Sequence, residues 1–227
     1  MDAARSPITP RRVALHFWCM ATWMATFVLL CSGGIVTSKG VGMSVPDWPT
    51  TYGYNMFFFP ISSWVGGIFH EHLHRLIASG IGLMTMILTV STLAVEPRRW
   101  VKNLVVIAFI AVCTQGLLGG LRVSLYKNEI GIFHGMLAQS FFCLLGILTI
   151  STSPRFLRGK WDIFLPHPFL KKIVLLATAL IFVQLALGAS MRHAHLGLSI
   201  PDFPLAYGNI LPDTSAPSVE KINEARL

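Results

Sequence analysis

Five long apolar stretches constrain the fold of this chain more than any other feature. They cover residues 13–35, 64–95, 101–121, 130–150 and 171–191. Each is long enough to cross the roughly 30 Å of hydrocarbon in a bilayer as a helix, and a helix satisfies its own backbone hydrogen bonds in lipid. Only 12% of the residues are charged and the mean hydropathy is +0.62. The sequence therefore predicts an all-α, multi-pass membrane bundle without a separate soluble domain.

The distribution of basic residues predicts the orientation of the spans. A net charge of +8 and a pI near 9.7 would suggest nucleic-acid binding in a soluble chain, but here the positive-inside rule explains them and no nucleic acid is expected. Basic residues gather before the first span and in the links after the second and fourth: Arg5, Arg11, Arg12, Arg98, Arg99, Lys102, Arg155, Arg158, Lys160, Lys171 and Lys172. We expect a cytoplasmic N-terminus in the cell (plasma) membrane, with residues after about 191 outside.

A repeated loop sequence indicates an internal duplication. Residues 44–53 read SVPDWPTTYG and residues 199–208 read SIPDFPLAYG, an offset of 155 positions that Gly33 with Gly188 and Gly42 with Gly197 also keep. The same offset moves His74 to position 229, beyond Leu227. We therefore expect a fragment or truncated product of an eight-helix architecture: a cytoplasmic N-terminus (1–12), a four-helix first half (13–150), a cytoplasmic loop (151–170), and the first helix and outer loop of an incomplete second half (171–227).

Ionisable residues within the apolar stretches predict a functional site. The second stretch contains Glu71-His72-Leu73-His74-Arg75, and His134 lies near the start of the fourth. Such groups are costly in hydrocarbon unless they are paired or liganded. Glu71 and His74 are three residues apart and share a helix face, whereas we expect His72 and Arg75 to point elsewhere. Because both spans run in the same direction, His74 and His134 lie at comparable depth, where two imidazoles could bind a haem iron from opposite sides.

Other residues leave alternatives open. Arg122 and Lys127, in the short connection before His134, could pair with haem propionates or simply snorkel towards the interface. The outer loop could be an aromatic interfacial cap or contact a substrate. The Glu71-x-x-His74 spacing also occurs in di-iron bundles, but no second acid lies deep in a span. The remaining histidines and the four cysteines are predicted to be interfacial or packing residues: His16, His70, His72, His167, His193, His195, Cys19, Cys31, Cys113 and Cys143.

Glycines and other small residues near the two histidines could make room for a flat macrocycle, although ordinary helix packing explains them equally well. They are Gly66, Gly67, Ala78, Gly80 and Gly82 in the second span and Gly131 and Gly135 in the fourth. A looser likeness relates Gln115, Gly119, Gly120 and Arg122 to Gln184, Gly188, Ala189 and Arg192. It indicates that the third and fifth spans resemble each other.

The chain resembles the haem A synthase family over nearly all of residues 11–211. The most specific motifs are Glu71-x-x-His74-Arg75, His134-Gly135 and the twice-used Pro-Asp-aromatic-Pro loop with Tyr-Gly after it. The resemblance implies eight helices in two halves, each with a histidine pair. His74 and His134 would bind the substrate haem O, Glu71 would lie at its reacting edge, and a haem b would occupy the second half, beyond Leu227.

The family reaction oxidises a methyl group of haem O to a formyl group, with water as the oxygen source, for cytochrome oxidase assembly. Some members carry a cysteine pair in the first outer loop, but residues 36–63 here contain no cysteine, so the electron acceptor is unidentified. Membrane lipid and haem O synthase are further expected partners, and a homo-oligomer is compatible with the sequence. Two other functions are open: a bis-histidine membrane cytochrome b for electron transfer, and a non-haem transporter or assembly subunit.

Overall fold

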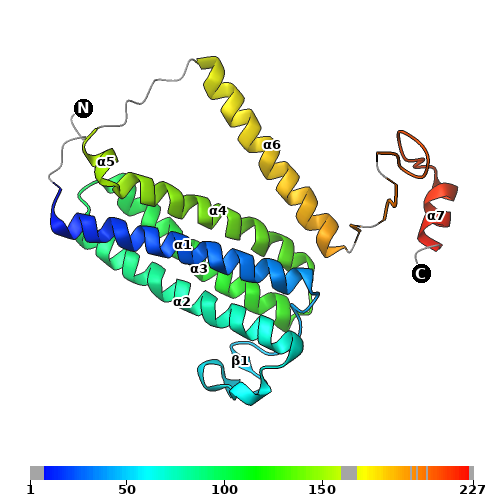
Figure 1. Ribbon diagram of the computed structural model, residues 1–227, viewed down its shortest axis with the longest axis horizontal. Coiled ribbons are helices and arrows are strands. Elements are labelled where there is room, and N and C mark those ends of the chain that lie inside the picture. Colours follow the sequence, from blue (N-terminus) through cyan, green and yellow to red (C-terminus); the bar gives the residue numbers. More distant parts are fainter. Residues whose placement is uncertain (1–7, 160–167, 195, 198, 203, 225–227) are drawn as a thin grey trace.

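The computed structural model describes residues 8–159, 168–194, 196–197, 199–202 and 204–224. Within these residues, five helices are long and apolar enough to span a membrane (Figure 1). They are α1 (Pro10–Ser38), α2 (Gly66–Val95), α3 (Arg99–Ser124), α4 (Glu129–Thr152) and α6 (Pro168–His193). The predicted all-α, multi-pass membrane fold is confirmed. Helices α1, α3, α4 and α6 extend a few residues beyond the apolar stretches, whereas α2 begins slightly inside its stretch, at Gly66. Thr9 caps the start of α1 by accepting a hydrogen bond from the Arg12 amide, and Pro10 follows it.

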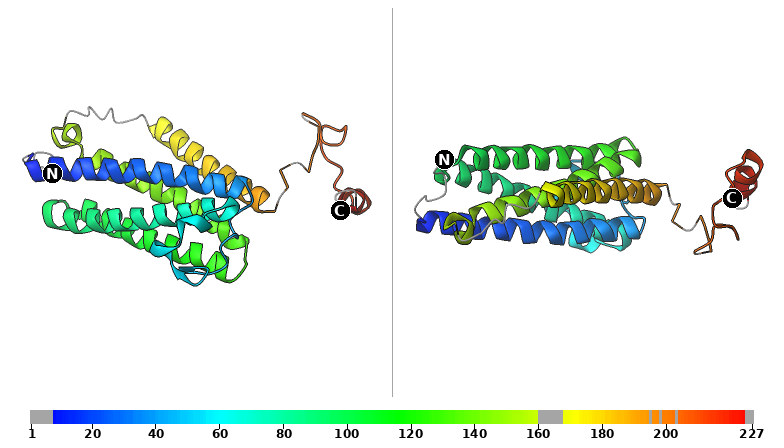
Figure 2. Two further views of the ribbon diagram at one scale, coloured as in Figure 1. Left: turned by 60° about the horizontal axis from the view of Figure 1, so that its bottom comes forward. Right: turned by 90° about the horizontal axis from the view of Figure 1, so that it is seen from above.

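Helices α1 to α4 form a four-helix bundle in which each helix packs against its neighbours in the order α1, α2, α3, α4 and back to α1. Helices α2 and α4 are therefore diagonal to each other. Figure 2 shows the four helices running alongside one another in two side views. Large apolar side chains fill the centre, with Leu88, Val101, Val105 and Leu145 fully buried. Apolar side chains also cover the outer faces, as expected where lipid rather than water surrounds the bundle.

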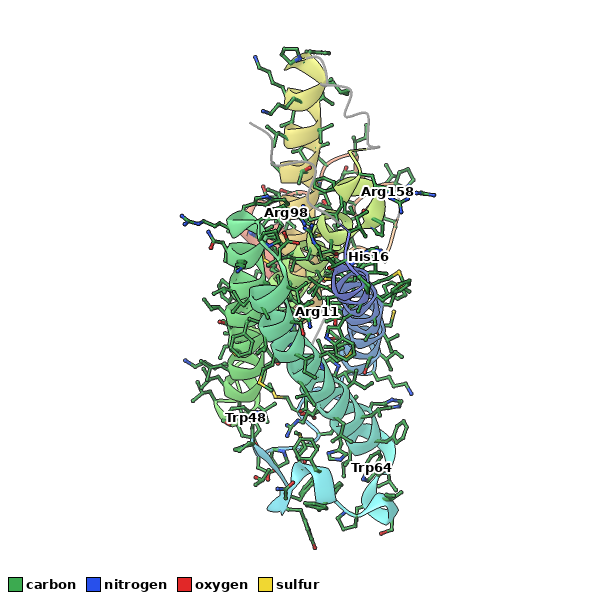
Figure 3. The ribbon with its side chains drawn as sticks, turned by 90° about the vertical axis from the view of Figure 1, so that its left-hand side faces the viewer. Arg11, His16, Trp48, Trp64, Arg98 and Arg158 are labelled. Atoms are coloured by element: carbon green, nitrogen blue, oxygen red, sulfur yellow. The ribbon has the colours of Figure 1, made fainter. Side chains whose placement is uncertain are left out.

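At one end of the bundle, a buried cluster of ion pairs connects α1, the segment after α2, and α4. Arg12 of α1 lies 3.1 Å from both carboxylate oxygens of Glu96, which follows α2, and Arg98 Nε lies 2.6 Å from Glu96 Oε1. Arg98 also donates to the Ser151 carbonyl of α4 at 2.8 Å. The sequence assigned Arg12 and Arg98 only to the charge of the inner face, whereas the structure pairs both with Glu96. Figure 3 shows this end, marked by Arg98, opposite the end that carries Trp48 and Trp64.

The first outer loop joins α1 to α2 and contains strands β1 (Thr50–Thr51) and β2 (Tyr54–Asn55), followed by single turns η1 (Met56–Phe58) and η2 (Ile61–Ser63). Asp47 accepts hydrogen bonds from the amides of Tyr52 (2.7 Å) and Gly53 (2.9 Å). Tyr52 has a φ of 49° and Gly53 a φ of 78°. Glycine is favoured at such a positive φ, which explains the Tyr-Gly pair that ends the motif.

The second copy of the motif repeats this geometry. Asp202 accepts from the amides of Tyr207 (2.8 Å) and Gly208 (2.7 Å), and these two residues have φ values of 55° and 79°. The Tyr207 hydroxyl donates to the Ser199 carbonyl, as Tyr52 donates to Ser44. The sequence repeat is therefore also a structural repeat.

Beyond the bundle, α6 packs mainly against α4. None of the described residues of α6 is buried. The short helices are α5 (Pro154–Leu157), which follows α4, and α7 (Ala216–Glu224), which follows the second loop copy. The domain boundaries and the eight-helix arrangement stay predictions.

Candidate functional site

His74 of α2 and His134 of α4 face each other across the bundle, close enough to interact electrostatically. Each ring lies against a glycine of a neighbouring helix. His74 Cε1 is 3.1 Å from the position that a Cβ would take on Gly33 of α1, and His134 Cε1 is 3.4 Å from the same position on Gly119 of α3. All four helices of the bundle therefore shape the space around the two imidazoles.

Both imidazoles are short of hydrogen-bond partners. The Nδ1 atoms of His74 and His134 are buried and, within the described residues, have no partner. Gln115 of α3 donates to the backbone carbonyl of His134 at 3.0 Å but not to the ring, and its own Oε1 is also unpaired there. Buried polar atoms are nearly always satisfied, so such a cluster needs an explanation. Two imidazoles on diagonal helices of the bundle are side chains that would fit as ligands of a haem iron.

Arg122, in the last turn of α3, reaches into the same region. A Cβ on Gly42 would lie 2.9 Å from Arg122 Nη1, and one on Gly131 would lie 3.1 Å from Arg122 Nε. Arg122 interacts electrostatically with Glu71, His74 and His134, and its buried Nε has no partner among the residues that the structure describes. Lys127, the other predicted propionate donor, is exposed in the α3–α4 turn. The structure therefore brings Arg122, but not Lys127, to the two histidines.

Glu71 lies on the same helix as His74, and each of its carboxylate oxygens accepts a hydrogen bond. Its Oε1 accepts from Arg75 Nη2 at 2.8 Å and its Oε2 from the Val45 amide at 2.9 Å. Arg75 also donates to the backbone carbonyls of Val45, Asp47 and Thr50 at 2.8, 2.7 and 3.2 Å. The expectation that Arg75 points away from Glu71 was wrong, because residues four apart on a helix also share a face and the outer loop folds down to supply the acceptors.

The outer loop caps the site. The Trp48 ring lies against Gly120 of α3, where any Cβ would collide with it, and Ser44 lies against Gly67 at the start of α2 in the same way. Together with the Glu71–Arg75 clamp, these contacts hold residues 44–52 over the end of the bundle. Trp48 is still 44% exposed, so it lies at the rim of the cap.

The neighbouring histidines have structural partners. His72 is fully buried beneath the loop, with Nδ1 3.2 Å from the Thr51 hydroxyl and its ring packed against Phe59 and Trp64. His70 Nε2 lies 2.7 Å from Lys39 Nζ, and His16 Nδ1 lies 3.3 Å from the Thr152 hydroxyl. These contacts agree with the packing and interfacial roles predicted for them. His167 and His195 lie outside the described residues.

His193, at the end of α6, was predicted to be solvated or interfacial but lies half-buried beside the site. Its Cε1 would be 2.5 Å from a Cβ on Gly131, and it interacts electrostatically with His134. Arg192 next to it donates to the Ser38 hydroxyl of α1.

The glycines that face the His74 and His134 rings are Gly33 and Gly119, which were not among the small residues named from the sequence. Of those that were named, Gly131 lies against Arg122 and His193, and Gly67 lies against Ser44. Gly80, Gly82 and Gly135 have open space around the Cβ position, and Gly66 has a φ of 53° at the start of α2. Of the cysteines, Cys19 is buried and packs in the core, while Cys31, Cys113 and Cys143 are exposed; all four are free thiols. No group of three or more histidine, cysteine or acidic side chains in the described part of the chain could hold a metal ion.

Comparison with known proteins places the chain in a family. Residues 58–225 match the family model described as cytochrome oxidase assembly protein. The chain is 26% identical over 217 residues to the haem A synthase of Geobacillus kaustophilus, covering 88% of this chain and 63% of that protein. It is 26% identical over 216 residues to the haem A synthase of Halalkalibacterium halodurans (90% and 68%), and 24% identical over 210 residues to that of Shewanella oneidensis (83% and 60%).

No solved structure matches the chain significantly. The chain spans a little under two thirds of the length of the Geobacillus relative, so it corresponds to part of such a protein. The family match covers well over half of the chain and includes both histidines and the second loop copy at residues 199–208, whereas the first copy at residues 44–53 precedes it. The chain therefore belongs to the haem A synthase family of cytochrome oxidase assembly proteins.

Proposed function

We propose that this chain binds haem O between His74 and His134 as the substrate site of a haem A synthase-type oxidoreductase. The observation that carries the proposal is the pair of buried, unpartnered imidazoles on diagonal helices at one depth. The sequence relatives support it, because those named above are haem A synthases. The reaction would convert a methyl group of haem O to a formyl group, with water supplying the oxygen atom and electrons passing to an acceptor that remains to be identified.

Each residue of the site has a distinct part in this proposal. His74 and His134 supply the two nitrogen ligands, while Gly33 and Gly119 leave room for the rings beside them. Arg122 would pair with a propionate. Its buried Nε has no hydrogen-bond partner among the described residues, and Glu71 is the acid with which it interacts electrostatically. Lys127 remains a weaker candidate, because it would have to fold back from the exposed turn.

Glu71 would lie at the reacting edge of the macrocycle. In the structure each of its oxygens accepts one hydrogen bond, and each keeps a second lone pair that can take a proton. Its carboxylate therefore has two parts in the proposal: it holds the loop over the site, and it receives a proton as water adds to the oxidised carbon. A Glu71→Gln variant removes the base but also replaces one of the two acceptors by an NH2 donor, so the order of the loop has to be measured beside haem conversion.

The location and partners follow from the same proposal. The chain would lie in the plasma membrane with its N-terminus in the cytoplasm, as the basic residues of the links indicate. The histidine sites would then lie towards the outer surface. A haem b in a second half, delivery of haem O by haem O synthase, and association with further copies of the chain remain part of the proposal.

The test is haem analysis of the purified chain from a host that supplies haem O. The wild type should carry haem O or its hydroxylated or formyl products, and His74→Ala and His134→Ala should each lose them. His70→Ala is the matched control, since His70 lies on the same helix but pairs with Lys39 outside the site. Histidine-dependent haem b without haem O would favour an electron-transfer cytochrome b. No histidine-dependent haem would favour a transporter or assembly subunit.

A further inference from the structure

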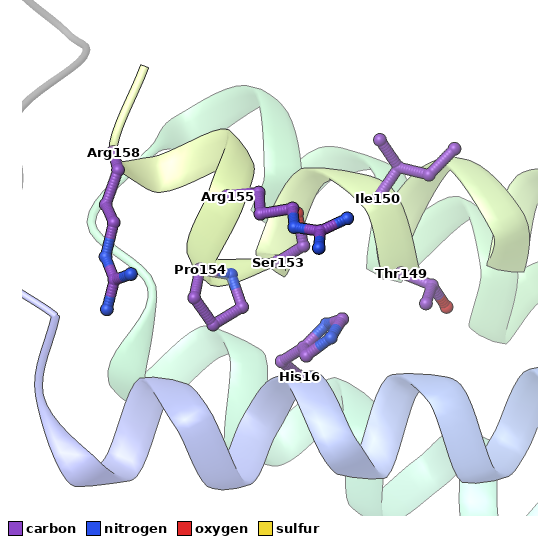
Figure 4. Close-up of a pocket in the computed structure, with 7 residues that line it drawn as sticks. All are labelled: His16, Thr149, Ile150, Ser153, Pro154, Arg155 and Arg158. Carbon is purple, nitrogen blue, oxygen red and sulfur yellow. The ribbon is translucent and has the colours of Figure 1, made fainter. Parts of the chain in front are cut away.

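The opposite end of the bundle carries a pocket that the haem proposal does not use. It lies between α1 and the junction of α4 with α5, has a volume of about 510 Å³, and is shown in Figure 4. His16 of α1 forms its floor in that view, Thr149 and Ile150 of α4 form one side, and Arg155 of α5 and Arg158, which follows α5, complete the lining. The histidine site lies at the other end of the same helices.

The pocket is positively charged. Among the described residues, no acidic side chain makes a hydrogen bond or ion pair with Arg155 or Arg158. Glu96, the acid described at this end of the bundle, already binds Arg12 and Arg98. Two guanidinium groups thus face a common cavity without a counter-charge, and planar guanidinium groups match the oxygens of phosphate or carboxylate.

Apart from the arginines, the accessible surface of the pocket is mostly apolar, although His16, Thr149 and Ser153 also line it. Ile150 and Pro154 supply the apolar side chains, and Ile150 is 48% exposed on the outer face of α4. The two transmembrane helices α1 and α4 also end at this level, where lipid headgroups lie. A ligand that fits both features has an anionic head for the arginines and acyl chains for the apolar flank.

We propose that this pocket binds the headgroup of an anionic phospholipid, with Arg155 and Arg158 donating to its phosphate. The basis is the unpaired arginine couple above an apolar wall at the end of two membrane helices. Its acyl chains lie along the exposed surface between α1 and α4. A free phosphate ion would match the arginines but not the apolar flank. The proposal does not depend on haem, because the pocket shares no residue with the histidine site.

Native mass spectrometry of the full chain tests this proposal. The protein is released from nanodiscs that contain equal amounts of phosphatidylglycerol and phosphatidylcholine, and the retained lipid is identified. The wild type should retain phosphatidylglycerol in preference to phosphatidylcholine. The double variant Arg155→Gln/Arg158→Gln should retain about tenfold less phosphatidylglycerol, because two charge-assisted hydrogen bonds are lost. Should it fail to fold, as judged by gel filtration, the two single variants are measured instead.

The matched control is Arg99→Gln/Lys102→Gln, which removes the same charge at the same end but outside the pocket. It should retain phosphatidylglycerol like the wild type. Equal retention by the Arg155/Arg158 variant and the wild type would overturn the proposal. So would an equal loss in the control, which would indicate surface charge alone, or equal retention of phosphatidylcholine. Displacement of the lipid by millimolar inorganic phosphate would point to a simple anion site instead.

Discussion

The two ends of the bundle differ in whether their buried polar groups have hydrogen-bond partners. At the Arg98 end, Glu96 is 2% exposed and accepts hydrogen bonds from two arginines that come from different parts of the chain. At the end covered by the outer loop, the Nδ1 atoms of His74 and His134 and the Nε of Arg122 are buried without partners in the described structure. A paired cluster joins separate helices, whereas unpaired buried polar groups are rare in folded proteins and need an explanation, which the proposed haem site supplies.

Replacement of Glu96 should have the largest effect on stability. A Glu96→Gln variant leaves Arg12 and Arg98 buried next to a neutral amide, and breaking a buried pair from one side costs about 3–5 kcal/mol. The thermal unfolding of the protein in detergent should shift accordingly. Glu129→Gln, which removes an exposed acid in the first turn of α4, is the control and should change little. A similar small effect for both variants would contradict the structural role given to Glu96.

Replacement of a site histidine should have the opposite profile. His134→Leu removes an unpartnered polar ring, so the unfolding free energy of the haem-free chain should change by less than about 1 kcal/mol or even increase. Haem O binding, in contrast, should be abolished, as a titration followed by visible absorbance would show. His72→Leu is the informative comparison, because His72 is buried with a hydroxyl partner and its loss should lower stability. A strongly destabilised His134→Leu would show that the ring has a structural partner.

Removal of the loop clamp should have an intermediate, local effect. Arg75→Gln removes donors to three loop carbonyls and to Glu71. We expect amide exchange in residues 44–55 to accelerate about tenfold to a hundredfold, as the loss of about 1.4–3 kcal/mol of local stability would produce. The bundle core should keep its protection, which hydrogen exchange with mass spectrometry would resolve. Uniform acceleration across all helices would mean that the clamp supports the whole fold.

Glycine substitutions beside His74 offer a finer test. A Cβ on Gly33 would come within 3.1 Å of His74 Cε1, whereas the same position on Gly34 has nothing within 4 Å. Gly33→Ala should therefore displace the ring and weaken haem O binding by roughly tenfold, in line with the 1–3 kcal/mol that overpacking costs. Gly34→Ala should bind like the wild type. Equal binding by both variants would indicate that the ring can move aside freely.

Much of this arrangement follows from the sequence, and what does not has clear physical reasons. The spans could be predicted from the length of the apolar stretches, and the repeat from the matching residues at a constant offset. The approach of His74 to His134 could be predicted because both spans run in the same direction. The Glu71–Arg75 clamp could not, since the loop carbonyls that orient Arg75 are set by tertiary folding. Nor could the salt bridge of Glu96 with Arg12, whose partners lie 84 positions apart. The contacts of Gly33 with His74 and of Gly119 with His134 could not be predicted either, because they depend on how each helix is rotated about its own axis in the bundle.

The two loop copies provide the smallest and most local prediction. Burial disfavours the charged Asp47 carboxyl, but hydrogen bonds from the Gly53 amide, the Thr50 hydroxyl and the Tyr52 amide outweigh it and hold its pKa below the usual value. The amides of Gly208 and Tyr207 likewise lower the pKa of Asp202. A lowered pKa means that each carboxylate stabilises its turn above the unfolded pKa of about 3.9, and that this stabilisation is lost as the pH falls through the folded value.

Acid should therefore loosen both turns, but not equally. The copy at residues 44–53 is also held by Arg75 and by the contacts of Trp48 with α3, whereas no such clamp contacts the copy at 199–208 among the described residues. Amide exchange at Gly208 should accelerate more than at Gly53 when the pH is lowered below about 3.9, after correction for the intrinsic pH dependence of exchange. Asp202→Asn should remove the pH dependence at Gly208. An equal response of the two copies would mean that Asp47 and Asp202 alone set the stability of these turns, and that the clamp by α2 positions the first turn without strengthening it.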